Sequence, residues 1–210
     1  MNIQLTEEEK IKVLNGDDLY GIMQKILLRE ERIDRDREHF WIVGLANNNR
    51  ILFIELISLG SVNATIAEPM EVFSLALQKR AVNIILVHNH PSGELKPSES
   101  DMDNTDRLIQ VGKIVNLPVY DHLIISEKSY MSFRDVGHLE ALNNSTKYVP
   151  TFVLEEKFKK EAEELKEKGA VLAKSEIVLN MLADGADLEL ISKYTGISIE
   201  EVKALGRENS

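Results

Sequence analysis

Cysteine is absent from the 210 residues of this chain. Disulfide bonds and thiolate metal sites are therefore excluded, and any bound metal must be held by nitrogen and oxygen ligands. The chain also lacks an apolar run of membrane-spanning length, and its first ten residues show no basic segment followed by an apolar core. These absences favour a cytoplasmic protein that makes no membrane contact.

Basic clusters are the second feature that the sequence lacks. The formal net charge is -10 at pH 7, whereas general binding to a phosphate backbone draws its affinity from Lys and Arg side chains that displace counterions. DNA is therefore a disfavoured partner.

With 43% apolar residues, the chain can form one sizeable domain with a small appendage, or two small domains.

One stretch, residues 84–101, joins a short apolar run to three side chains that bind metals well. The apolar run Ile84–Val87 has the length and branching of a buried strand, and His88 and His90 follow at its end. Residues two apart on a strand point the same way, and a helix that opens after the loop can bring Asp101 back to them. Two imidazoles and a carboxylate form the ligand set of an open catalytic zinc site, which leaves a fourth position for water.

Each part of this cluster also has an ordinary structural explanation. A His-x-His pair can be a hydrogen-bonded surface pair, and Ser98-x-x-Asp101 can be a simple capping box. The two parts occur together, however, and Pro91 and Pro97 constrain the loop between them. Because ligand clusters are more informative than lone residues, the combination favours a metal site.

The flanking segments predict a mixed sheet with helices. Apolar residues recur at helical spacing up to Arg29, and Asn47-Asn48-Asn49 is typical of a hairpin turn. We expect an α/β or α+β sandwich with a mixed sheet rather than a doubly wound parallel sheet. The expected helices are 17–29, 67–80 and a third that ends before Pro118; the expected strands are 40–46, 51–59, 84–87, 119–125 and 130–133.

A second region follows the main domain, which is expected to close near Gly137. A polar, turn-rich linker reaches Pro150, and helices are expected at 152–168, 175–183, 188–194 and 200–205. The last two have the rhythm of a helix-turn-helix. Glu200 and Glu201 would place negative charge where a recognition helix approaches phosphates, so we favour a packing or protein-contact role for this tail.

The string His88-x-His90-Pro91-x6-Ser98-x2-Asp101 matches the JAMM metalloprotease motif of JAB/MPN domains, and its His-Asn-His-Pro-Ser-Gly start resembles the RadC branch of that family. The resemblance implies a cytidine-deaminase-like sandwich, zinc bound by the two histidines and the aspartate, and a role for Ser98 in stabilising the oxyanion. The expected organisation is an N-terminal helical segment (1–33), a RadC-like JAB/MPN domain (34–137), a linker (138–150) and a helical, helix-turn-helix-like tail (151–210).

The resemblance also implies a glutamate general base at the start of a strand through the sheet core. Glu38 fits because it immediately precedes the strand that begins near Phe40, although the charged run that it ends is otherwise solvated. Glu55 is the rival, and Glu68 and Glu71 stand further behind. A general base must lie at the edge of the site within reach of the attacking water, which favours Glu38.

Several features limit what the resemblance implies. Asn89 stands where the eukaryotic deubiquitinating members carry Ser or Thr, so ubiquitin-type substrates do not carry over. We find no helix-hairpin-helix motif in residues 1–37, which weakens the link to DNA. An HNH nuclease spreads its three residues over a ββα unit and is not matched. His122 is interpreted as a structural histidine and is left out of the site.

The expected function is that of a zinc-dependent hydrolase of the metallopeptidase or isopeptidase type, with a protein or peptide substrate and Glu38 as general base. The alternative is a non-enzymatic DNA-repair or mobile-element accessory protein that binds DNA or a protein partner.

Overall fold

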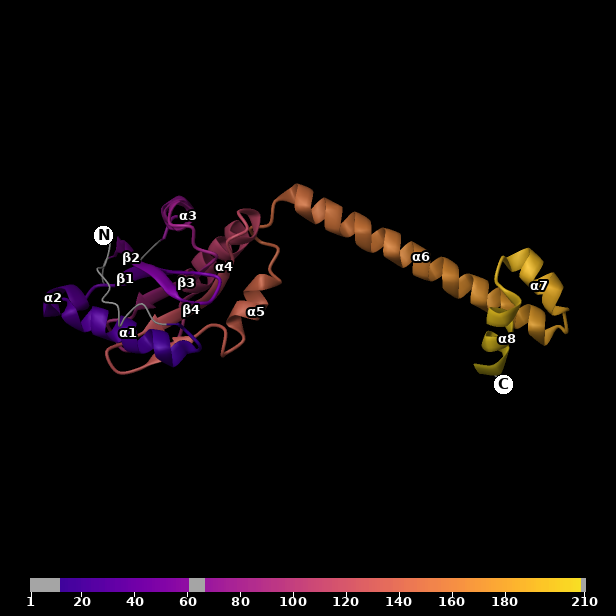
Figure 1. The fold of residues 1–210 in the computed structure, drawn as a ribbon, viewed down its shortest axis with the longest axis horizontal. Coiled ribbons are helices and arrows are strands. Elements are labelled where there is room, and N and C mark those ends of the chain that lie inside the picture. Colours follow the sequence, from indigo (N-terminus) through magenta and orange to yellow (C-terminus); the bar gives the residue numbers. More distant parts are fainter. Residues whose placement is uncertain (1–11, 61–66, 209–210) are drawn as a thin grey trace. The chain divides into compact units, whose positions relative to one another are not determined.

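The computed structural model describes residues 12–60 and 67–208. The chain divides into two compact units, Met1–Val149 and Pro150–Ser210 (Figure 1). Of the predicted N-terminal helical segment, residues 1–11 lie outside the described residues. The remainder forms helix α1 (Gly16–Arg29), which is capped by the Asn15 side chain, and the short helix α2 (Arg32–Arg35).

A five-stranded mixed sheet forms the centre of the first unit. Its strands lie in the order β2-β1-β3-β4-β5, where only the β3–β4 pair is parallel and the other pairs are antiparallel. The predicted α+β class with a mixed sheet is therefore confirmed. The strands are β1 (His39–Leu45), β2 (Ile51–Leu59), β3 (Asn83–Asn89), β4 (Val119–Ile125) and β5 (Tyr130–Ser132).

Helices cover both faces of this sheet, so that the central strands are buried on two sides. Helix α1 packs on one face, and α3 (Pro69–Gln78), α4 (Glu99–Ile114) and α5 (His138–Asn143) pack on the other (Figure 1). Within β3, Ile84 and Leu86 face α3 and α4, while Ile85 and Val87 face α1. This burial explains why β3 has an unbroken apolar run rather than an alternating pattern.

The segment predicted as a linker from residue 138 begins instead with α5. Leu139 is buried in the core beside α3 and α4, and Gln110 of α4 donates a hydrogen bond to the Leu142 carbonyl at 3.1 Å. The first unit therefore continues past Gly137 because α5 covers apolar surface that α4 would otherwise expose. Gly137 itself has a φ of 82°, a left-handed conformation that glycine adopts without strain.

The second unit consists of one long helix and two short ones: α6 (Thr151–Ala183), α7 (Leu188–Thr195) and α8 (Ile199–Glu208). Two helices, 152–168 and 175–183, were expected where α6 is continuous through Gly169. One glycine costs only about 1 kcal/mol in a helix, and the alanines and leucines around it favour helix. The unit's buried core is small and consists of Val178, Ile191 and Val202.

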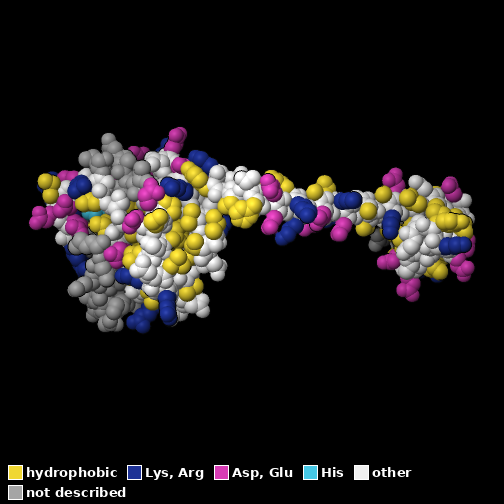
Figure 2. Space-filling model, turned by 90° about the horizontal axis from the view of Figure 1, so that it is seen from above, with side chains coloured by type: hydrophobic (Ala, Val, Ile, Leu, Met, Phe, Trp, Pro, Cys, Tyr) yellow, Lys and Arg dark blue, Asp and Glu magenta, His cyan; other side chains and the backbone are white. Residues whose placement is uncertain are grey.

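Most of α6 is solvated in this unit. Val178 is its only buried residue, and apolar side chains such as Phe158 and Leu165 are exposed. Figure 2 shows apolar side chains interspersed with charged ones of both signs along this helix. Among the described residues, no helix of either unit has the length and apolar character needed to cross a membrane.

Candidate metal centre

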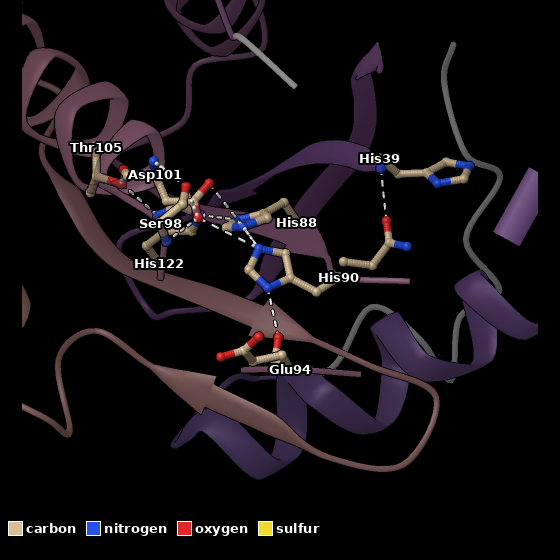
Figure 3. A network of polar contacts seen from close by, with 9 residues as sticks. His39, His88, His90, Glu94, Ser98, Asp101, Thr105 and His122 are labelled. Carbon is tan, nitrogen blue, oxygen red and sulfur yellow. Dashed lines mark hydrogen bonds and ion pairs between the residues drawn. The ribbon is translucent and has the colours of Figure 1, made fainter. Parts of the chain in front are cut away.

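The end of β3 places two histidines on the sheet face that α4 covers. His88 and His90 continue the side of the strand that carries Ile84 and Leu86, because alternate residues of a strand share a face. The Phe40 ring stacks on His88 with centroids 6.1 Å apart, which helps to fix the imidazole plane. Helix α4 begins beside this strand end and brings Asp101, from its first turn, against both rings (Figure 3).

The three predicted ligands converge on one point. His88 Nε2 lies 3.0 Å from His90 Nε2 and 3.3 Å from Asp101 Oδ1, and His90 Nε2 lies 3.5 Å from Asp101 Oδ2. A tetrahedral zinc ion with ligand bonds of about 2.0–2.1 Å separates its ligand atoms by about 3.3 Å. His88 Nε2 thus lies at such a spacing from one atom of each of the other two residues, and one candidate ligand atom from each of the three lies within 4.8 Å of the others, so these residues could hold a metal ion.

The capping box of α4 orients the carboxylate ligand. The backbone N–H and the hydroxyl of Ser98 both donate to Asp101 Oδ2 at 2.7 Å, and the Asp101 N–H donates to Ser98 Oγ at 3.1 Å. Oδ2 is thus occupied by the cap, whereas Oδ1 faces His88. The predicted cap and the predicted ligand are the same residue, and Ser98 holds that residue in place.

A chain of hydrogen bonds behind His88 fixes which of its nitrogens carries the proton. The Thr105 hydroxyl donates to the Asp101 carbonyl at 2.5 Å, so its oxygen must accept from His122 Nδ1 at 2.7 Å. A neutral His122 then has no proton left on Nε2, which accepts from His88 Nδ1 at 2.7 Å. His88 Nε2 therefore keeps its lone pair, as a metal ligand requires.

The loop between β3 and α4, residues 90–98, fixes the protonated nitrogen of His90 in a similar way. His90 Nδ1 lies 2.6 Å from the Glu94 carbonyl, which can only accept, so Nδ1 carries a proton and Nε2 faces the site. Gly93 makes this possible, because its φ of 81° turns the chain back and its N–H donates to the His90 carbonyl. Both histidines thus present Nε2 through backbone and side-chain acceptors that lie outside the cluster.

The charge states of these groups also suit metal binding. Burial lowers the pKa of His88 and lowers that of His122 well below its usual range, so both rings are neutral at pH 7. Burial raises the pKa of Asp101, but interactions with protonated forms of His88 and His90, and the Ser98 hydrogen bond, outweigh burial and hold that pKa well below the ordinary value. Asp101 is therefore a carboxylate, the form that coordinates a metal. Burial lowers the pKa of His90, but its contacts with Asp101 and the Glu94 carbonyl outweigh burial and raise that pKa, so a bound metal would have to displace a proton from this ring.

Glu38 lies immediately before β1 and is half-buried. Burial raises its pKa, nearby His90 partly offsets that rise, and Asp101 adds to it. The Glu38 carboxyl group therefore interacts electrostatically with His90 and Asp101. The rival carboxylates pair with cations: Glu55 is 3.5 Å from Lys79, which follows α3, and Glu68, which precedes α3, is 3.3 Å from Arg107. Glu71 lies in the first turn of α3.

Sequence reasoning missed the roles of His122 and Thr105. A lone histidine is usually structural, and its contact with His88 spans 34 positions across the parallel β3–β4 pair. The usable signal was strand alternation: His122 pairs with Leu86 in that register and so shares the sheet face of the ligands. Phe133 stacks on the His122 ring at 4.6 Å and holds it in place.

Comparisons with known proteins agree with this arrangement. A family model described as the RadC-like JAB domain matches residues 15–138. A UPF0758 protein of Caldanaerobacter subterraneus is 40% identical over 135 residues, which are 64% of this chain and 56% of that protein. A UPF0758 protein of Desulforudis audaxviator is 43% identical over 111 residues, 53% of this chain and 48% of that protein. The chain spans about half the length of the curated relatives it matches.

Proposed function

The chain belongs to the RadC-like JAB domain family, and from that premise we propose that its His88, His90 and Asp101 cluster is a zinc site that hydrolyses amide bonds in a protein or peptide substrate. The family match confirms the resemblance seen in the motif. The observation that carries the proposal is the meeting of two Nε2 atoms and a carboxylate within metal-ligand distance of one another.

Zinc is the metal that this donor set suits best. Two neutral imidazoles and one carboxylate are a recurring ligand set of hydrolytic zinc sites, and three protein ligands leave one position open. The His90 and Asp101 side chains are 12% and 16% exposed, whereas that of His88 is 2% exposed, so solvent reaches the cluster from the side of His90 and Asp101. A zinc ion held there would supply a Lewis acid that polarises the scissile carbonyl and acidifies water.

Glu38 is the residue that we assign to proton transfer. Its carboxylate would accept a proton from the attacking water and deliver it to the leaving amine. A raised pKa suits this exchange, because the carboxylate is then a stronger base and its conjugate acid exists closer to neutral pH.

Ser98 has two uses for one hydroxyl. Its proton is donated to Asp101 Oδ2 in the structure, and rotation about the Cβ–Oγ bond would direct that proton to an oxyanion. Asp101 Oδ2 would still accept from the Ser98 backbone N–H at 2.7 Å. The cap therefore survives the rotation, so Ser98 can stabilise developing charge without releasing the ligand.

Amide hydrolysis fits this site better than phosphodiester cleavage. Two-metal phosphoryl sites hold their ions about 4 Å apart with additional bridging carboxylates. Within residues 12–60 and 67–208, His88, His90 and Asp101 form the single cluster with metal-ligand spacing. One metal beside one base matches the needs of a carbonyl substrate.

The test combines metal analysis with a substrate panel. We expect about one zinc ion per chain in the wild type, loss of that zinc in His88→Ala, and retained zinc with kcat lowered by about 10²–10⁴-fold in Glu38→Gln. Peptide, isopeptide and nucleic-acid substrates should be compared with the zinc-loaded protein. Absence of stoichiometric zinc, or cleavage of nucleic acid in place of peptide bonds, would contradict the proposal.

A further inference from the structure

The backbone ladder between β1 and β3 stops at the edge of the site. Its last pair is Phe40 with His88, and the same register continued would set His39 opposite Asn89 and Glu38 opposite His90. Alternation places Glu38 on the sheet face of Phe40 and therefore on the face of His88 and His90. Glu38 can serve the site only if the segment immediately before β1 is held in place beyond the end of the ladder.

The Asn89 side chain continues the ladder beyond that point. Its Oδ1 accepts a hydrogen bond from the His39 N–H at 2.7 Å, and its Nδ2 donates to the Arg37 carbonyl at 3.1 Å. One primary amide thus supplies the acceptor and the donor that a neighbouring peptide group would supply. Asn89 is 1% exposed, so water cannot easily replace these bonds.

The two bonds bracket a single residue. Arg37 and His39 flank Glu38, and the Glu38 carbonyl accepts from the Gly60 N–H at 2.8 Å on the side of β2. Arg37 Nε also donates to the Gly60 carbonyl at 3.2 Å. The backbone at Glu38 is therefore fixed toward β3 by Asn89 and toward β2 by Gly60.

We propose that Asn89 is the positioning residue for Glu38, holding the general base in register with the two histidines between which Asn89 lies. This inference rests on the proposed function, in which Glu38 transfers the proton. Asparagine suits the position on chemical grounds, because aspartate lacks the N–H donor and serine offers one atom where two are needed. In the sequence His88-Asn89-His90, the two proposed metal ligands thus point to one face of the sheet, and the residue that positions Glu38 points to the other.

Asn89→Ala and Asn89→Asp test the two hydrogen bonds. In Asn89→Ala we expect unchanged zinc content, little change in KM, and a fall in kcat of about 100-fold, the cost of displacing a catalytic group by roughly 1 Å. The His39 amide of the metal-free protein should exchange its hydrogen at least about tenfold faster than in the wild type. Asn89→Asp keeps the acceptor for His39 but turns an oxygen toward the Arg37 carbonyl, so it should lower kcat while slowing His39 exchange relative to Asn89→Ala.

A double-mutant cycle separates positioning from general damage. If Asn89 acts through Glu38, adding Asn89→Ala to Glu38→Gln should cost less than about twofold in further kcat, because the group being positioned is already inactive. Additive losses would mean that Asn89 acts on the histidines instead, and the proposal would be wrong. Asn143→Ala, which removes an amide bonded to the Leu139 carbonyl in α5, is the matched control and should leave kcat and His39 exchange unchanged.

Failure of the proposed function remains distinguishable from failure of this inference. If the zinc-loaded wild type hydrolyses no amide, the proposed function fails, and the exchange measurement together with a crystal structure of Asn89→Ala still decides the placement of Glu38. Unchanged His39 exchange or an undisplaced Glu38 backbone in that variant would overturn the role of Asn89. Faster exchange with a displaced Glu38 would support it.

Discussion

The same capping box opens a helix in each unit of the molecule. Ser98 and Asp101 cap α4, and Ser198 and Glu201 cap α8 with the same three hydrogen bonds, at distances of 2.7, 2.7 and 3.1 Å against 3.2, 2.8 and 3.3 Å. At α8 the carboxylate meets only its serine, which lowers the pKa of Glu201. At α4 the carboxylate also meets His88 and His90.

The difference shows what turns a structural motif into a site. A capping box is sufficiently explained by the unpaired N–H groups of a helix start, and α8 needs no other explanation. At α4 the box lies against a strand that is buried on both faces, and that strand presents two imidazoles to the carboxylate. The small core of the second unit offers no comparable rigid neighbour to α8.

The largest expected effect comes from removing each carboxylate in turn. Asp101→Ala should abolish stoichiometric zinc binding, because one of three protein ligands is lost. Glu201→Ala should leave zinc content at the wild-type value. Metal analysis after gel filtration measures both, and equal zinc in the two variants would remove the functional distinction between the boxes.

A smaller effect is expected from opening the core of the second unit. Ile191→Ala should destabilise residues 150–210 by about 2–5 kcal/mol, the usual cost of removing a buried isoleucine side chain. Hydrogen exchange should rise in α7 and α8 while zinc affinity stays unchanged. Loss of zinc binding in this variant would show that the metal centre depends on the second unit.

His122→Ala should weaken zinc binding by about 10–100-fold, the typical cost of losing a partner that orients a ligating histidine. Thr105→Val removes the acceptor that fixes the His122 tautomer and should cause a smaller loss in the same direction. Competition with a chelator of known affinity measures both values. A wild-type zinc affinity in His122→Ala would show that the tautomer of His88 needs no such support.

Ser98→Ala should cost about 1 kcal/mol of stability through loss of the helix cap and should lower kcat as well. Ser198→Ala removes the matching hydroxyl at α8, so it should loosen that helix locally with no change in kcat. Urea denaturation and steady-state kinetics on the two variants make the comparison. An unchanged kcat in Ser98→Ala would show that the Ser98 hydroxyl caps the helix and does not stabilise an oxyanion.

The smallest effect is expected in the pH profile. Glu38 must be ionised to accept a proton, and burial raises its pKa. Activity should therefore be full above that raised pKa and fall as the pH drops through it, at a higher pH than an ordinary glutamate of about 4.3 would give. The acid limb of kcat/KM should be measured with zinc content checked at each pH, and a limb at the ordinary value would argue against Glu38.

The cluster of His88, His90 and Asp101 was predictable because its signal is local. A buried strand, a turn and a capped helix within residues 84–101 bring three donor groups together, and each step follows from short-range patterns. The mixed sheet was predictable for a similar reason, since Asn47–Asn49 marks a hairpin and segments with helices separate β2 from β3 and β3 from β4.

Other features depend on contacts between distant parts of the chain. To predict that His122 of β4 contacts His88, one must know the parallel register of β3 and β4. To predict that the Asn89 side chain bonds to the backbone of residues 37–39, one must know where the β1–β3 ladder ends. The place of α5 in the core depends on apolar surface that α4 leaves open. The continuity of α6 is a different case, because the penalty of one glycine was simply outweighed by its neighbours.

The third residue of α4 has a consequence for protein engineering. Capping boxes ordinarily favour glutamate or glutamine at this position, as α8 does with Glu201, and a stability-guided redesign would replace Asp101 by glutamate. The added methylene would preserve the cap and push the carboxylate out of the metal's coordination distance. If the proposed zinc site is correct, sequence libraries scored on folding alone would therefore enrich well-folded proteins that do not bind the metal.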